Sequence, residues 1–278
     1  MAEWKGRFLM PRRSKLFVIA VVTLAAVATV MALPPIPQSQ GYHNFADRRS
    51  LLGIPNFLDV TSNAAFLLVG ALGLLFLSRR RESNPETPFA ERAEQWPYAT
   101  LFLGIALTGL GSAHYHLAPN NARLLWDRLP MTIAFTAILS AIITERIGVK
   151  VGVSSLLPLV AVGIGSVVYW QVTELGGRGD LRPYALVQFY PVLAIPLIMF
   201  LFPSRYTRSA DLLGAAALYA VAKACEAFDA QIFAVGRIVS GHTLKHLAAA
   251  TATYLILRML QKRRLVAGDL RSALPRRS

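Results

Sequence analysis

Two histidines stand four residues apart near the end of the sequence, His242 and His246 in the run SGHTLKHL. Residues at this spacing on a helix share one face, with their side chains about 6 Å apart. A third histidine, His116, ends an apolar run much earlier in the chain. Three imidazole nitrogens with one open position form the ligand set of a hydrolytic zinc site. The pattern therefore predicts a metal centre that makes a water molecule nucleophilic at neutral pH.

Two further side chains fit catalytic roles beside these histidines. Ser112 precedes His116 by four residues, so on a helix it lies on the same face, one turn deeper. Its hydroxyl could donate a hydrogen bond to a carbonyl oxygen or to the oxyanion formed from it. Asp127, eleven residues after His116, could accept a proton from the water and pass it to a leaving amine. We predict His116, His242 and His246 as metal ligands, and Ser112 and Asp127 as catalytic residues.

Each of these residues also has a structural explanation. A pair of histidines on an apolar helix is weak evidence by itself, and Ser112 could bond back to the carbonyl four residues earlier. His114 points roughly 200° away from His116 on a helix, so we do not expect it to be a ligand. His43 receives no role. The single cysteine, Cys225, excludes an intrachain disulfide and a cysteine-built metal site.

The composition places these residues in an integral membrane protein. Hydrophobic residues make up 54% of the 278 positions, and the mean hydropathy is +0.46. Charged residues fall to 16%, against about 25% in ordinary globular domains. A helix needs about 20 mostly apolar residues to cross the hydrocarbon core. We predict an all-α fold with eight membrane-spanning helices, at residues 16–33, 57–77, 98–116, 128–145, 151–172, 186–202, 212–229 and 239–260.

The lysines and arginines predict the orientation, because basic loops stay on the cytoplasmic side. With the N-terminus inside, 20 of the 29 lie in inner segments and 7, Arg128 among them, in outer segments; Lys223 and Lys245 lie within helices. Both termini are then cytoplasmic, and the five site residues lie near the outer leaflet. The net charge of +14 is spread over every inner loop. It is explained by topology and anionic lipid, and it does not indicate a nucleic-acid partner.

The order and spacing of the five site residues resemble the alkaline ceramidase family. This family belongs to a superfamily of seven-helix membrane hydrolases that includes the adiponectin-receptor-like proteins. The resemblance covers about residues 42–264 and includes the stretch IPNFLDVTSN at residues 54–63. It implies zinc on the three histidines, Ser112 and Asp127 completing the catalytic set, and cleavage of the linear amide bond of ceramide, a step of sphingolipid metabolism.

The resemblance also implies a domain organisation. Residues 41–264 would form the seven-helix hydrolase domain, residues 1–40 a basic flank with one extra membrane anchor, and residues 265–278 a basic cytoplasmic tail. The short loops and the lack of an organelle-retention signal indicate a bacterial inner membrane. Many bacteria lack ceramide, so the lipid substrate could be another N-acyl lipid.

Relatives from higher organisms carry a calcium-binding loop before the first core helix. In this sequence few side chains of that region could bind calcium: Asp47 and Asn56, with Asn44 or Asp59. This favours a site with zinc alone over one with zinc and calcium.

Two other functions stay open. A receptor or sensor with the same helices would use the metal for structure and show little turnover. A transporter would use Lys223, Glu226 and Asp229, spaced three residues apart on one helix, as a charge relay, although ion pairing also explains them. A bis-histidine haem protein is less well matched, because His242 and His246 share one helix face.

Overall fold

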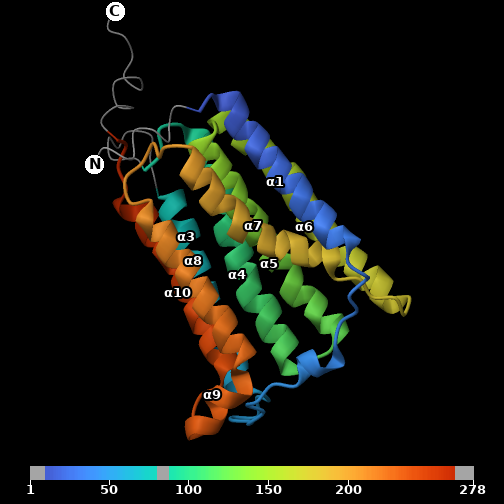
Figure 1. The fold of residues 1–278 in the computed structure, drawn as a ribbon. Helices are drawn as coiled ribbons and strands as arrows, with labels where there is room; N and C mark the ends of the chain where they lie inside the picture. The colour runs from blue at the N-terminus through green and yellow to red at the C-terminus, as the bar shows by residue number, and fades with distance from the viewer. Residues whose placement is uncertain (1–9, 80–87, 267–278) are drawn as a thin grey trace, which may run out of the picture.

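The computed structural model describes residues 10–79 and 88–266, and over these ranges its regular elements are helices, without a strand (Figure 1). Two isolated β-bridges occur in this part of the chain, between Leu51 and Ile54 and between Tyr206 and Leu265. The beginning of the predicted basic flank, the inner-loop residues Arg80 and Arg81, and most of the predicted C-terminal tail lie outside the described residues.

Each predicted span coincides with a helix or with a pair of consecutive helices. The long helices are α1 (Arg12–Ala32), α4 (Gln95–Leu117), α5 (Asn121–Arg146), α6 (Val149–Leu175), α7 (Arg182–Leu201), α8 (Ala210–Ala227) and α10 (Gly241–Lys262). The span predicted at residues 57–77 is divided into α2 (Phe57–Thr61) and α3 (Ala64–Ser78), and a short helix that the sequence did not predict, α9 (Asp229–Gly236), precedes α10. Single 3-10 turns lie at Gln40–His43 and Arg92–Glu94.

Five of the described helical segments are long and apolar enough to cross a membrane: α1, α2 with α3, α5, α6 and α7. An all-α protein able to cross a membrane several times is therefore confirmed. The remaining long helices, α4, α8 and α10, carry the histidines and lysines of the polar groups described below. These polar residues lower the hydropathy of the helices that hold them.

Helix α5 begins seven residues before the predicted start at residue 128. The side chain of Asn120 accepts a hydrogen bond from the backbone N–H of Arg123 at 2.9 Å, which caps the first turn. Asp127 and Arg128 therefore lie in the second turn of α5. Arg128 was counted above as an outer-loop charge, and this was wrong, because its side chain is buried in the bundle.

The two ends of the bundle carry different groups. At one end, Arg12 of α1 donates to the carbonyl of Ile147 at 3.0 Å, and the buried Arg263, just after α10, pairs with Glu145. The histidines lie at the other end, which we call the histidine end. His116 is in the last turn of α4, and His242 is in the first turn of α10.

A segment between α1 and α2, residues 36–49, crosses the histidine end close to α9 (Figure 1). It is fixed to several helices along its length. The carbonyl of Ile36 accepts from the N–H of Leu181, and the N–H of Ala46 donates to Asp229. Arg49 donates to the carbonyl of Ile238. The 36–49 segment thus closes this end of the bundle over the histidines.

Candidate metal centre and active site

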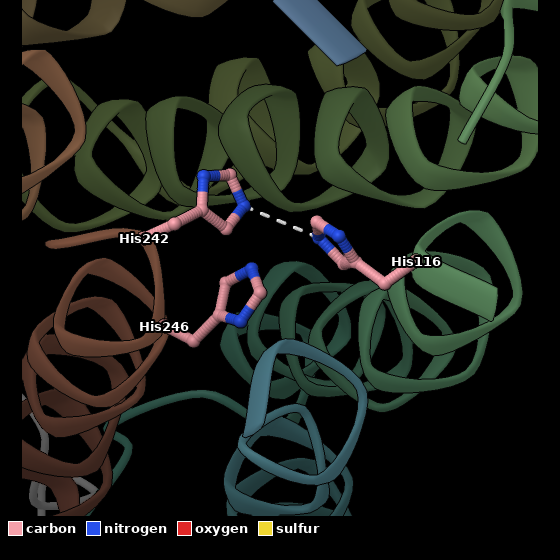
Figure 2. A group of neighbouring side chains, drawn as sticks. All are labelled: His116, His242 and His246. Carbon is pink, nitrogen blue, oxygen red and sulfur yellow. Dashed lines mark hydrogen bonds between the residues drawn. The ribbon is translucent and has the colours of Figure 1, made fainter. Parts of the chain in front are cut away.

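Three histidine side chains meet at the histidine end (Figure 2). His116 reaches in from α4, and His242 and His246 from successive turns of α10. All three are buried, with exposed fractions of 1%, 3% and 2%. The ring centroids are 4.8 to 5.0 Å apart, and one nitrogen of each ring lies within 4.8 Å of the others. Among the described residues, this is the group of histidine, cysteine and acidic side chains placed to hold a metal ion.

The spacing of the nitrogens fits a metal. Nε2 of His116 and Nε2 of His242 are 3.2 Å apart. Two nitrogens bound to one tetrahedral zinc at 2.0–2.1 Å lie about 3.3 Å apart. Nε2 of His246 and Nδ1 of His116 are both buried, and neither has a hydrogen-bond partner. A buried nitrogen without a partner is costly, and a metal bond would satisfy the Nε2 atom of His246. The three residues are compatible with zinc, although other divalent ions also accept three imidazoles.

The first turn of α10 is held rigidly where it presents His242. Ser240 caps the helix by accepting from the N–H of Thr243 at 3.0 Å, and Asp229 accepts from the N–H of His242 at 2.7 Å. A Cβ atom on Gly241 would lie 2.2 Å from the carbonyl oxygen of Cys225. Only glycine therefore allows α10 to begin against the end of α8.

The break between α2 and α3 supplies further support that the sequence did not reveal. The hydroxyl of Ser62 lies 2.8 Å from Nδ1 of His246. Asp59 is buried and accepts from the hydroxyls of Thr243 at 2.6 Å and Ser240 at 3.3 Å. Ser62, Asp59 and Asn56 belong to the stretch IPNFLDVTSN, and the sequence did not predict their contacts with α4 and α10.

Aromatic side chains cover the histidines. Phe45 of the 36–49 segment lies 4.6 Å from the ring of His116 and 4.4 Å from that of His242, centroid to centroid. Phe66 of α3 contacts His246 from another side at 6.2 Å. A hydrophobic shell of this kind limits the access of water to a metal and lowers the local dielectric constant.

Ser112 and Asp127, the predicted catalytic pair, are buried next to each other. The Asp127 carboxylate lies near the Ser112 hydroxyl, and both side chains are buried. Gly111 makes this approach possible, because a Cβ atom there would lie 2.0 Å from the carbonyl oxygen of Trp126. One turn of α4 separates Ser112 from His116.

The other histidines lie outside the metal group. His114 is exposed on α4. The two ring nitrogens of His43 each lie 2.8 Å from an oxygen, one from the hydroxyl of Tyr115 and the other from the side chain of Asn121. His43 thus fixes the 36–49 segment to α4 and α5.

The side chains considered for calcium have separate partners. Arg49 binds Asp47 at 2.7 Å and lowers the pKa of that carboxyl group. Asn44 accepts from Arg48 at 2.8 Å, and Asn56 donates to the carbonyl of His116 at 2.7 Å. Asp59 faces α10, as described above.

The three residues considered for a charge relay, Lys223, Glu226 and Asp229, do not form one group. Glu226 pairs with Lys223 on the same helix and with Lys245 of α10 at 3.2 Å. Tyr42 donates to the same carboxylate at 3.4 Å. Asp229 lies apart from this group, because it begins α9 and holds the N–H groups of Ala46 and His242.

Comparison of the chain with protein-family models, with curated proteins and with solved structures finds no match in any of the three. The resemblance to alkaline ceramidases therefore rests on the five site residues and on residues 54–63, and it stays a prediction.

Proposed function

We propose that the chain is a zinc-dependent membrane hydrolase that cleaves the amide bond of ceramide or of a related N-acyl lipid. The observation that supports this most is the group of three buried histidines with converging nitrogens. The fold we propose is a seven-helix core, from α2–α3 to α10, with α1 as an extra anchor. We further propose a bacterial inner membrane, with both termini cytoplasmic and the histidine end near the outer leaflet.

The reaction consumes one water molecule for each amide. The water oxygen adds to the carbonyl carbon, the C–N bond breaks, and a fatty-acid carboxylate and a protonated amine leave. A zinc ion, when bound, would polarise the carbonyl and lower the pKa of the attacking water. His116, His242 and His246 would hold that ion.

The chain's own residues would handle the proton and the developing charge. Asp127 would accept the proton of the water and deliver it to the nitrogen that leaves. Ser112 would donate its hydroxyl hydrogen to the carbonyl oxygen as that oxygen becomes negative. Both residues are buried, at 7% and 3% exposure. Burial strengthens such interactions, because the local dielectric constant is low.

A lipid substrate agrees with the surroundings of the site. The helices that carry or surround it expose large apolar side chains on their outer faces, such as Leu68 of α3 and Leu110 of α4. Acyl chains could lie against these faces with the amide at the histidine end. The scissile bond would then be close to the membrane surface, where water is available.

A receptor or sensor with a structural metal is the second candidate. The observation that favours it is the contact of Phe45 with two of the histidine rings. A tightly covered metal has less room for a water molecule and a substrate carbonyl. A transporter based on Glu226 is less well supported, since that carboxylate is held by Lys223, Lys245 and Tyr42.

Metal analysis and turnover together test the proposal. We expect about one zinc per chain in detergent-purified wild type and in His114→Ala, the matched control on α4. His116→Ala and His246→Ala should lose the metal. Asp127→Asn should keep the zinc and lose hydrolysis of N-acyl lipids. A zinc-loaded wild type that hydrolyses none of them would instead support the receptor or sensor.

A further inference from the structure

Arg128 is a buried cation beside the proposed catalytic aspartate. Its exposed fraction is 5%, although it lies within a helix that can cross a membrane. Three aromatic rings surround the guanidinium carbon, at 4.3 Å for Trp170, 4.6 Å for Tyr184 and 5.7 Å for Tyr42. An arginine at membrane depth is costly and usually serves a function.

The guanidinium group has only part of its hydrogen bonding satisfied. Nη2 donates to the side-chain oxygen of Gln38 at 2.5 Å, whereas Nη1 is buried and has no partner. Within residues 10–79 and 88–266, no carboxylate forms an ion pair with Arg128. Gln38 links Arg128 to Glu174, but the Glu174 carboxylate accepts its hydrogen bonds from Gln38, Asn121 and Trp170. In the described part of the chain, the buried charge therefore has no carboxylate hydrogen-bonded to it.

The surroundings hold this guanidinium ready for such an anion. Flat rings on several sides fix its plane, and Gln38 fixes one edge, so little rotational freedom remains to be lost on binding. The planar fork of arginine matches a carboxylate or a phosphate, which can accept two parallel hydrogen bonds.

The group lies close to the proposed chemistry. Arg128 directly follows Asp127 in α5. Tyr42, one of its aromatic neighbours, belongs to the same 36–49 segment as Phe45, which contacts the rings of His116 and His242. An anion on Arg128 would thus be near an amide at the histidines.

We infer that Arg128 binds a carboxylate or phosphate of the lipid; where the head group of the substrate supplies it, acidic N-acyl lipids are the substrate class. This rests on the proposed function. The anion has two possible sources: the head group of the substrate, or the fatty-acid carboxylate that hydrolysis releases. Both place a negative charge within a few bonds of the scissile amide.

A matched pair of substrates separates these sources. N-palmitoylglycine carries a carboxylate next to the amide, and N-palmitoylethanolamine has the same acyl chain and a neutral head group. The proteins to compare, all zinc-loaded in detergent, are wild type, Arg128→Gln, and Arg178→Gln, which removes an exposed arginine between α6 and α7. Palmitate binding by calorimetry provides a readout that does not depend on turnover.

For a head-group site, Arg128→Gln should lower kcat/KM for N-palmitoylglycine about tenfold to a hundredfold, as expected for a hydrogen bond to a charged group. N-palmitoylethanolamine should be unaffected. For a product site, the preference between the substrates should stay the same, while palmitate binds more weakly by a similar factor. Arg178→Gln should change neither quantity.

Arg128→Gln protein with wild-type zinc content and helicity that keeps both the substrate preference and the palmitate affinity would overturn the inference. If that variant does not fold, Arg128→Lys decides, because it keeps the charge and loses the fork. For Arg128→Lys we expect about tenfold weaker palmitate binding at a product site, or about tenfold lower kcat/KM for N-palmitoylglycine at a head-group site; a variant unchanged in both would contradict the inference. If the zinc-loaded wild type hydrolyses neither lipid nor ceramide, the proposed function fails, and palmitate binding still tests Arg128.

Discussion

Ser62 and His246 meet across the bundle, with the serine hydroxyl 2.8 Å from Nδ1 of the imidazole. This contact orients the ring so that Nε2, which is buried and without a partner, faces the other two histidines. Outer partners of this kind set the tautomer of a ligand and typically change metal affinity tenfold to a hundredfold.

Ser62→Ala should therefore weaken zinc binding by about tenfold or more. The loss follows because nothing then fixes Nδ1 of His246. Competition with a chelator of known affinity measures the change. Ser78→Ala, which removes an exposed serine at the end of α3, is the control and should bind zinc like wild type. Equal affinities for both variants would show that Ser62 does not orient the ligand.

Asp59→Ala should destabilise the start of α10. The substitution removes the carboxylate that accepts from the buried hydroxyls of Thr243 and Ser240. Each lost partner of this type costs about 1–3 kcal/mol. We expect a lower unfolding temperature in metal-free protein, together with weaker zinc binding, since His242 lies between the two hydroxyl residues. Unchanged thermal unfolding would mean that Asp59 does not stabilise this turn.

Gly111→Ala should separate α4 from α5. The added Cβ atom would lie 2.0 Å from the carbonyl oxygen of Trp126, and a backbone atom cannot yield without moving its helix. Overpacking of this kind costs about 1–3 kcal/mol. We also expect reduced turnover with zinc retained, because Ser112 moves away from Asp127. Gly165→Ala, which adds a methyl group where α6 has open space, is the matched control and should be neutral or slightly stabilising.

The contact between Asp180 and Arg182 predicts a dependence on pH. Hydrogen bonds from Arg182 lower the pKa of the Asp180 carboxyl from 3.8 to about 2. The same arginine donates to the carbonyl of Met31 at 2.9 Å and so holds the end of α1. Because the pKa is lower in the folded protein, the stabilisation is complete above pH 3.8 and is lost as the pH falls towards 2.

Asp180→Asn should accordingly be less stable than wild type by a constant amount from neutral pH down to about pH 4. Below that pH the difference should shrink. Thermal unfolding of both proteins across this range measures it. A difference that grew on acidification would contradict the assignment.

Apolar length alone was enough to predict the helices, because a bilayer requires long uncharged segments wherever the chain crosses it. The spacing of His242 and His246 likewise predicted a shared face. The sequence did not reveal α9, nor the early start of α5, because the cap at Asn120 lies in a polar stretch that reads as a loop. Arg128 was misplaced for the same reason.

The supporting residues were harder to predict. Ser62 and His246 are 184 residues apart in the chain, and Asp59 and Thr243 are equally distant. A single sequence contains no signal for such pairs, since neither periodicity nor composition links two distant segments. Their contacts arise only when α2, α3 and α10 pack together.

The same separation has a consequence for biogenesis. His116 and His242 are 126 residues apart, and His242 and His246 both lie on the last helix of the described chain. A ribosome makes the chain from its N-terminus, so earlier helices are in place before α10 exists. The three-histidine ligand set is therefore incomplete until α10 has been synthesised and has reached α4. A nascent chain that stops before α10 presents one of the three histidines, and metal capture becomes a late step that reports a finished bundle.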